Sequence, residues 1–415
     1  MTSEKQSPLT AKRIFFGVSI LGFLTAIGSL LLSRGESWIR ILEENGSFYL
    51  GDFLMHISFV DKPAEVYSAY EGCCFPPFAY LFYLFVNRIL PTDGDPSMNE
   101  YRMIPATTIL YFCGVAFCMM VIALFVYEAL ENKRAQALLA CALILFSEPF
   151  FAGAIERGNS VLLTLVLLLG FLYCKDSEKP LLREVALFLL VAAACFKIYP
   201  AVFGFLYLRE KRYREFIRLV IYGAILFFVP FAFFGGVRGL LALLSNLKNV
   251  GAKPTTDIYT ISGCLQWLWS RLASSQEIPL SVQRAGKILS VVYLLAALLC
   301  TWFEEEEWKR FLYLGSLMII FTNSSYPYTT IYLLLPLLSF LKHHGEGKSV
   351  SESLYGLCFG LIFTVLMIPD GRIIALFGKS FAFLLRYFAL YPMLLAAMAG
   401  TAVSCYNQRS VGIKR

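Results

Sequence analysis

The sequence predicts an all-α, polytopic integral membrane protein, and two observations carry this prediction. Of the 415 residues, 58% are hydrophobic and only 16% are charged, whereas soluble domains average roughly 25% charged residues. The apolar residues also come in blocks of about 11 to 25, separated by short polar joints, which is typical of membrane-spanning helices. The composition excludes a secreted disulfide scaffold, a disordered chain and a nucleic-acid-binding protein, because the net charge of +7 is spread over the joints instead of forming one basic face.

The predicted spans follow one another along the chain, each apolar throughout and bounded by polar residues. They cover 14–32, 103–127, 135–151, 159–174, 184–196, 198–208, 219–235, 285–302, 311–322, 329–341, 352–368 and 381–403. We expect about 12–13 transmembrane segments in all. The first span follows Lys12 and Arg13 and lacks a small-residue cleavage site, so we expect it to be retained and not removed as a signal peptide.

Two segments leave the path across the membrane open. The apolar stretch 184–208 is interrupted by Lys197 and Pro200, so it is either one kinked span or two. Such breaks are tolerated where a segment lines a cavity. Residues 75–90 are apolar enough to cross the membrane. A span there would put the basic joints that follow it on the wrong side of the membrane, so we expect a juxtamembrane or re-entrant helix instead.

Clusters of lysine and arginine orient the predicted spans, because basic joints favour the cytoplasmic side. All of these joints are cytoplasmic, and so are both chain ends, if 184–208 crosses twice. Two large loops, 33–102 and 236–284, are then extracytoplasmic. We therefore expect one transmembrane domain over 1–415, with its core spans in 103–235 and its C-terminal spans in 285–415.

The first of these loops carries a candidate catalytic group. Asp52 lies shortly after the first span, among aromatic and aliphatic neighbours. A carboxylate held near the outer membrane surface is a candidate general base, or else a helix N-cap or a solvated loop acid. Glu71, shortly before a double proline, has the same two interpretations.

Two basic side chains are candidates for binding a phosphate. Arg157 stands where a Leu-rich helix begins, and free backbone N–H groups, the helix dipole and a guanidinium together favour an anion there. Alternatively, Glu156 pairs with Arg157. Lys197 lies inside an apolar stretch, where a lysine costs about 2.5–3.5 kcal/mol on insertion scales and normally has a function or a partner, unless its side chain snorkels to an interface.

A polar, aromatic joint at 322–328 separates two closely spaced late spans. Its hydroxyl, amide and aromatic side chains are of the kinds that bind a sugar ring, although a proline turn with interfacial tyrosines explains them as well. The second large loop contains an amphipathic stretch, 240–250, and the pair Trp267 and Trp269, which suit a membrane interface.

Several familiar motifs are absent from the sequence. It contains no GxxxxGK[ST], HExxH, GxSxG or kinase motif, no CxxC pair and no Cys/His cluster with metal-ligand spacing. We therefore expect neither ATP-driven chemistry nor a soluble nucleotide-sugar fold, and no cofactor or metal.

Taken in order, six short motifs resemble glycosyltransferase family 87, a group of polyprenol-phosphate-mannose-dependent mannosyltransferases within the GT-C superfamily. The motifs are Gly51-Asp52-Phe53, Phe75-Pro76-Pro77, Arg157-Gly158-Asn159-Ser160, Lys197-Ile198-Tyr199-Pro200, Arg209-Glu210-Lys211-Arg212 and Ser324-Ser325-Tyr326-Pro327-Tyr328. The resemblance covers about residues 14–341. Two positions depart from the family pattern: Asn159 replaces a glutamine in a shortened step, and Tyr328 stands where the family has a histidine.

The resemblance implies a GT-C-type glycosyltransferase fold and an extracytoplasmic hexosyltransferase of a bacterial cell membrane. A polyprenyl-phosphate hexose, with mannose as the first expectation, would donate its sugar with inversion to a lipid-linked or cell-envelope glycan. Asp52 would act as general base, and Arg157 and Lys197 would bind the donor phosphate. The residues expected to bind sugar and acceptor are His56, Glu71, Asn159, Tyr199, Asn323, Tyr326 and Tyr328.

Two other classes of membrane protein share parts of this pattern. A transporter or flippase for lipid-linked glycans also uses broken helices and an intramembrane lysine, but we find no internal repeat in the sequence. An envelope-polymer ligase or polymerase shares the long external loop, but it would carry arginines on the outer face, whereas here they cluster in the predicted cytoplasmic joints.

Overall fold

The structure is a computed structural model. In the part of the chain that it describes, all secondary-structure elements are helices. The described residues are 9–36, 39, 49–70, 73–91, 97–252, 259–273, 277–321, 325–364 and 381–412. Among them, five helices are long and apolar enough to cross a membrane. The prediction of an all-α, polytopic membrane protein is therefore confirmed.

These five candidate spans coincide with predicted ones. They are α1 (Ala11–Leu32), α7 (Pro105–Ala129), α12 (Tyr213–Phe228) continued by η4 (Val229–Ala232), α15 (Leu280–Phe303), and Leu384–Asn407 within α20 (Phe381–Gly412). A sixth is present if α8 (Arg134–Leu145) and η2 (Pro149–Ile155), which meet at a 50° bend, form one broken span. The total of about 12–13 segments stays a prediction.

The contacts divide the chain into two compact units, each built from separate stretches of sequence. We call 48–122 with 154–254 the site unit, and 1–47 with 123–153 and 255–415 the terminal unit. The single domain over 1–415 that the sequence suggests stays a prediction.

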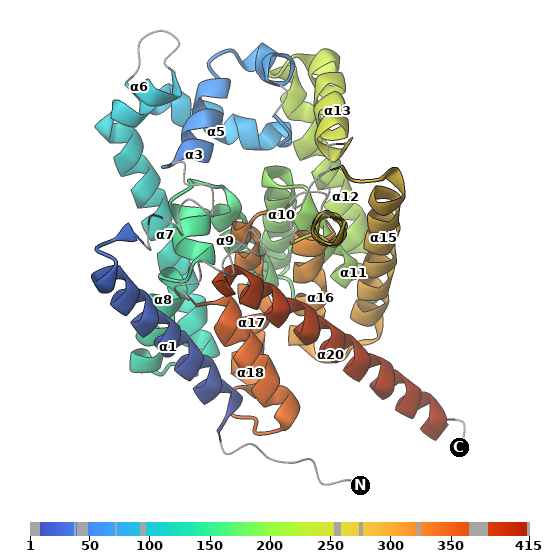
Figure 1. The fold of residues 1–415 in the computed structure, drawn as a ribbon. Coiled ribbons are helices and arrows are strands. Elements are labelled where there is room, and N and C mark those ends of the chain that lie inside the picture. The colour runs from blue at the N-terminus through green and yellow to red at the C-terminus, as the bar shows by residue number, and fades with distance from the viewer. Residues whose placement is uncertain are drawn as a thin grey trace. The chain divides into compact units, whose positions relative to one another are not determined.

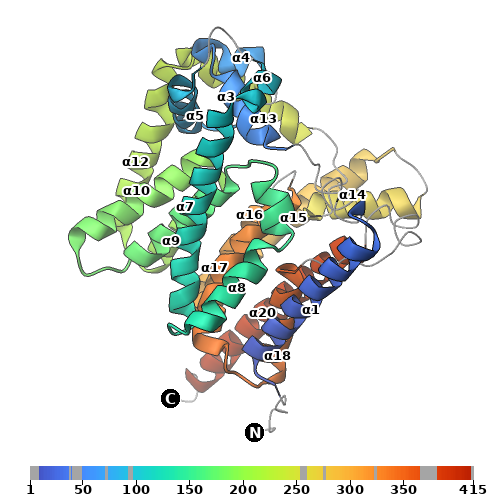
Figure 2. The same ribbon diagram turned by 90° about the vertical axis from the view of Figure 1, so that its left-hand side faces the viewer.

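In the site unit, one layer of helices lies at the end of a group of apolar helices (Figures 1 and 2). The layer consists of α3 (Gly51–Phe59), η1 (Pro63–Glu65), α4 (Val66–Ala69), α5 (Pro77–Ile89), α6 (Met98–Met103) and α13 (Gly236–Ala252). The group consists of the first part of α7, α9 (Val161–Cys174), α10 (Pro180–Phe196) and α12. Helix α10 packs against α9 and α12, and α3 packs against α5 and α6.

The predicted helix at 75–90 is α5, and its start follows from its sequence. Pro77 occupies the first helical position, where the fixed φ of proline suits the helix and no hydrogen bond is lost. Tyr80 and Tyr83 of α5 are at most 1% exposed and join Tyr67 and Tyr101 in an aromatic core. The loop 33–102 is thus a folded helical layer over the residues described in it.

The chain reverses direction at Lys197. Helix α10 ends at Phe196, Lys197 has extended backbone (φ −144°, ψ 126°), and η3 (Tyr199–Gly204) and α11 (Phe205–Arg209) follow. Just after α11, Glu210 accepts a hydrogen bond from the Lys175 ammonium, 2.7 Å away, close to where α10 began. Residues 198–209 therefore return along the length of α10, which favours two segments over one kinked span.

The terminal unit is a bundle in which α1 packs against α18 (Val350–Ile362), and α18 packs against α20. Its other helices are α8, α14 (Ile261–Leu272), α15, α16 (Glu307–Ile320), η5 (Pro327–Leu333) and α17 (Leu334–His344). The first turn of α1 and the last turn of α20 lie at the same end of this unit (Figures 1 and 2). That both chain ends lie on the cytoplasmic side of the membrane stays a prediction.

Glycines allow α1 and α18 to approach closely. A Cβ on Gly360 would lie 2.8 Å from Cβ of Val18, and one on Gly356 would overlap the Ala11 carbonyl oxygen. Small residues four apart are a common means of close helix packing in membranes.

An ion pair that our reading of the sequence did not single out lies inside the terminal unit. Arg386 of α20 donates to the Glu148 carboxylate, and the two side chains are 3% and 2% exposed. Both residues fall inside predicted apolar spans, and an ionisable residue there is itself a signal for a partner.

Because removing one member of a buried ion pair strands the other, we expect Arg386→Met to destabilise the protein by about 3–5 kcal/mol. The double variant Arg386→Met/Glu148→Leu should recover much of this loss. Thermal unfolding of the purified protein in detergent measures both, with Lys342→Met as control because the Lys342–Glu128 pair is largely exposed and should contribute little. Equal unfolding temperatures for Arg386→Met and Lys342→Met would contradict a stabilising role of the buried pair.

Candidate active site

The candidate active site forms where two short segments of the site unit lie side by side: residues 49–52 at the start of α3 and residues 155–159 ahead of α9. The backbone N–H of Leu50 donates to the Glu156 carbonyl (2.7 Å), and that of Asp52 donates to the Arg157 carbonyl (3.1 Å). The N–H of Tyr49 donates to the Glu156 carboxylate (2.9 Å). These bonds fix one segment against the other.

Gly158 makes this close approach sterically allowed. Its φ is +75°, in the left-handed region, and a Cβ there would lie 2.9 Å from Cβ of Phe53 and 3.0 Å from Cα of Leu50. Leu50 itself has φ +58°, which is strained for a branched side chain. The hydrogen bond from the Leu50 N–H to the Glu156 carbonyl stabilises this strained conformation.

This contact between the two segments places the Asp52 carboxylate within hydrogen-bonding distance of two donors. Its Oδ2 accepts hydrogen bonds from Arg157 Nε (2.9 Å) and Asn159 Nδ2 (2.5 Å). The described residues donate no hydrogen bond to Oδ1, and the side chain as a whole is largely buried. One carboxylate oxygen is thus fixed in place while the other remains able to accept a proton.

Asn159 is held at both ends of its amide. Nδ2 donates to Asp52, and Oδ1 accepts the N–H of Val161 (3.1 Å) at the start of α9. The second bond determines which way the amide faces, because only its oxygen accepts from an N–H. Asn159 therefore connects the first turn of α9 to the carboxylate.

Lys197 brings a second cation to the site. Its Nζ lies 3.9 Å from the centre of the Phe75 ring, and the residue is 7% exposed. Burial lowers the pKa of Lys197 to about 7, with Asp52 opposing and Arg157 adding to the shift. Because Lys197 and His56 of α3 both contact the Phe75 ring, Lys197 lies close to the helix that carries Asp52.

His56 lies one helical turn after Asp52 on α3 and is buried among aromatic rings. The ring centre of Phe75 is 4.3 Å from that of His56, and that of Tyr83 is 5.0 Å away. Burial, together with the charge of Lys197 and against the opposing charge of Asp52, lowers the pKa of His56 to about 3. The imidazole is therefore neutral at physiological pH.

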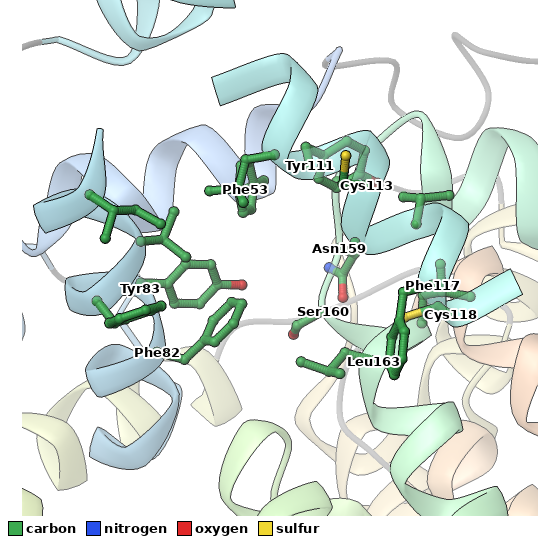
Figure 3. Close-up of a pocket in the computed structure, with 18 residues that line it drawn as sticks. Phe53, Phe82, Tyr83, Tyr111, Cys113, Phe117, Cys118, Asn159, Ser160 and Leu163 are labelled. Atoms are coloured by element: carbon green, nitrogen blue, oxygen red, sulfur yellow. The ribbon is translucent and has the colours of Figure 1, made fainter. Parts of the chain in front are cut away.

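An apolar cavity of about 320 Å³ adjoins the bonded pair. It is lined by α5, α7 and the start of α9, and Asn159 and Ser160 form part of its wall. Figure 3 shows Phe82 and Tyr83 on one side of the cavity and Asn159 and Ser160 on the other. Because Asn159 also bonds to Asp52, the cavity lies beside the candidate catalytic carboxylate.

The structure brings together five of the residues that the sequence predicted for the site. Asp52, Arg157 and Asn159 are directly bonded, and His56 and Lys197 both contact the Phe75 ring. The alternative pairing of Arg157 with Glu156 gives way to a pairing with Asp52 in the bonds that the structure shows.

Of the remaining predicted site residues, the structure describes three. Tyr199 is partly buried at the start of η3. Tyr326 and Tyr328 belong to the terminal unit, where their rings stack with centres 5.4 Å apart. Glu71 and Asn323 lie outside the described residues. For all of these, a role in binding sugar or acceptor stays a prediction.

Two residues contribute to the site in ways that the sequence analysis did not predict. Gly158 was quoted only as part of a motif, although a glycine just before a helix is a signal for a left-handed residue or a close approach. Phe75 was likewise only a motif member, and nothing in the sequence places its ring against Lys197.

Among the residues that the structure describes, no group of three or more His, Cys, Asp or Glu side chains lies close enough together to hold a metal ion. The chemistry that these residues offer is that of an oriented carboxylate, Asp52, beside two cations.

Comparison with known proteins gives one match. The family model described as glycosyltransferase family 87 matches residues 74–325, a stretch that contains Arg157, Asn159 and Lys197. Neither the curated proteins nor the solved structures give a match.

We expect Gly158→Ala to lower the thermal stability of the protein, because a methyl group would meet Phe53 and Leu50 and an alanine disfavours φ +75°. The loss should be at least about 1–3 kcal/mol, the usual size for a strained backbone position. Gly223→Ala is the matched control: it lies in α12, where a Cβ meets nothing within 4 Å, and should be neutral or stabilising. If both variants unfold at the temperature of the parent protein, the close approach at Gly158 is wrong.

Proposed function

The chain belongs to glycosyltransferase family 87, and from this premise we propose that it transfers a hexose from a polyprenyl-phosphate donor to a lipid-linked or cell-envelope glycan. The observation that carries the proposal is the Asp52 carboxylate, held through one oxygen by Arg157 and Asn159 beside an apolar cavity. Mannose is the hexose that the family resemblance suggests. The reaction would take place on the extracytoplasmic face of a bacterial cell membrane.

In the proposed reaction Asp52 is the general base. Its Oδ1 takes the proton of an acceptor hydroxyl, and the acceptor oxygen forms a bond to the anomeric carbon of the donor. The bond from that carbon to the phosphate oxygen breaks, so the products are the glycosylated acceptor and polyprenyl phosphate. A single displacement inverts the anomeric configuration. General-base assistance typically contributes about 10²–10⁴ in rate.

The leaving phosphate would be stabilised by Lys197 and Arg157. Both side chains are largely buried, and in such a setting one preorganised donor contributes about 3–4 kcal/mol to the transition state. Protonation also changes the charge that Arg157 faces. When Asp52 takes a proton, the negative charge of the Asp52 carboxylate is neutralised. The field of the guanidinium then acts on the charge that develops on the phosphate.

The cavity beside Asn159 would hold the part of the prenyl chain next to the phosphate. Its lining is almost entirely apolar, and one side is α7, a candidate membrane span. A lipid chain in the bilayer therefore has an apolar place to bind next to the carboxylate. Each buried CH₂ group contributes about 0.8 kcal/mol.

Family membership favours transfer over the transporter interpretation, because the matched family is one of glycosyltransferases. The contacts to sugar and acceptor remain part of the proposal. They are assigned to His56, Glu71, Asn159, Tyr199, Asn323, Tyr326 and Tyr328.

The catalytic assignment predicts that Asp52→Asn loses transfer by about 10²–10⁴ while the protein stays folded, because an amide of the same shape still accepts from Arg157. The measurement is transfer from a radiolabelled polyprenyl-phosphate hexose in membranes. The control is Asp176→Asn, an exposed carboxylate just after α9, which should keep the parent rate. Parent-level transfer by Asp52→Asn would refute a general base at this position.

The lipid assignment predicts that Gly114→Leu raises the donor KM. Gly114 lines the cavity, and a Cβ there meets nothing within 4 Å, so the larger side chain fits but occupies the space. Displacing about two CH₂ groups of the donor should raise KM roughly tenfold.

The effect of Gly114→Leu should be seen with a long-chain donor and be absent with a short-chain, water-soluble one. Gly17→Leu, at another open glycine in α1, is the control and should change neither KM. An equal effect of Gly114→Leu on both donors would show that the cavity does not hold the chain.

A further inference from the structure

The Phe75 ring contacts both Lys197 and His56. The Lys197 ammonium lies 3.9 Å from the ring centre, and the His56 ring lies 4.3 Å from it at an interplanar angle of 33°. The face of an aromatic ring carries partial negative charge and attracts a cation. Because Lys197 is 7% exposed, water screens this attraction little.

Phe75 is itself held by hydrogen bonds from residues outside the site. The hydroxyl of Tyr67 donates to the Phe75 carbonyl (2.7 Å). Asn246 of α13, 5% exposed, directs its Nδ2 at the carbonyls of Tyr67 (3.0 Å), Tyr70 (3.3 Å) and Cys73 (3.2 Å). The amide of Asn246 thus fixes backbone carbonyls of the segment that precedes Phe75.

A lysine that binds a phosphate needs such support. Its ammonium is a point charge on a flexible stem, without the rigid fork of an arginine. A carboxylate placed beside it would hold it but would also cancel the charge that the phosphate requires. An aromatic ring holds the ammonium and leaves its net charge in place.

We propose that Phe75 is a positioning residue, which holds the Lys197 ammonium for the donor phosphate through a cation–π contact, and that Asn246 acts through Phe75. The inference rests on the proposed role of Lys197 in binding that phosphate. It assigns functions to a ring and an amide that do not themselves touch the substrate.

The direct test replaces Phe75 by phenylalanines that carry one, two and three ring fluorines. Each fluorine weakens the charge on the ring face and changes the shape of the side chain little. We expect the donor KM to rise stepwise, roughly tenfold in all, and kcat to fall along the same series, because Lys197 also stabilises the leaving phosphate. The acceptor KM should change less than twofold. If Phe75 had only a structural role, the donor KM would not change stepwise with the number of fluorines.

The matched control is the same fluorine series at Phe78 of α5, whose ring meets Phe196 edge-on and should leave the donor KM unchanged. A flat donor KM along the Phe75 series overturns the cation–π contact.

Asn246 is tested by its coupling to Phe75. We expect Asn246→Ala and Phe75→Leu each to raise the donor KM, and the double variant to match Phe75→Leu alone, because one residue acts through the other. Thermal unfolding confirms that the variants compared are folded, and if Asn246→Ala is not, Asn246→Gln takes its place in the same comparison. Additive effects on KM would overturn the role of Asn246.

Binding of sugar-free polyprenyl phosphate separates this inference from the proposed function. If the protein transfers no hexose but binds this lipid with an affinity that falls along the Phe75 fluorine series, the transfer proposal fails and the inference stands. If transfer occurs without any fluorine dependence, the inference alone fails. If the lipid does not bind at all, Lys197 is not a phosphate-binding residue and the inference is overturned.

Discussion

The candidate site depends on the contact between residues 49–52 and 155–159. Three hydrogen bonds from backbone N–H groups hold the two segments together, and Gly158 supplies both the left-handed conformation and the space that the contact needs. The same contact turns Asp52 toward Arg157 and Asn159. A carboxylate, its partner cation and the start of α9 are therefore placed by one short piece of backbone geometry.

The electrostatics of the site follow from this placement. A buried carboxylate is tolerated where it is paired and hydrogen-bonded, and Asp52 has both an arginine and an amide. The second cation, Lys197, is supported by an aromatic face. Burial brings its pKa to about 7, so binding of an anionic phosphate and protonation of Lys197 reinforce each other. The neutral His56 packs in the aromatic wall without adding charge.

Much of the helical framework was predictable, and the reasons lie in particular segments. The apolar blocks at 14–32, 103–127 and 285–302 became α1, α7 and α15, because a long run of apolar residues in a membrane has few alternatives to a helix. The break at Lys197 was equally visible, since a lysine and a proline interrupt an apolar run. The path after the break was not, because it shows only in tertiary contacts such as that of Lys175 with Glu210, 35 residues apart in sequence.

By itself, the sequence determined that the chain is an all-α membrane protein. It also singled out Asp52 and Arg157 as charged residues at the edges of apolar segments, and Lys197 inside one, where a charge normally has a function or a partner. Asn159 was named only through the family resemblance. Only the tertiary structure decided which of them meet. The sequence left Arg157 open between a phosphate and its neighbour Glu156, and it gave Phe75 no partner. Pairing across more than a hundred residues depends on how helices pack and not on local pattern. The structure pairs Arg157 with Asp52 and places the Phe75 ring against Lys197.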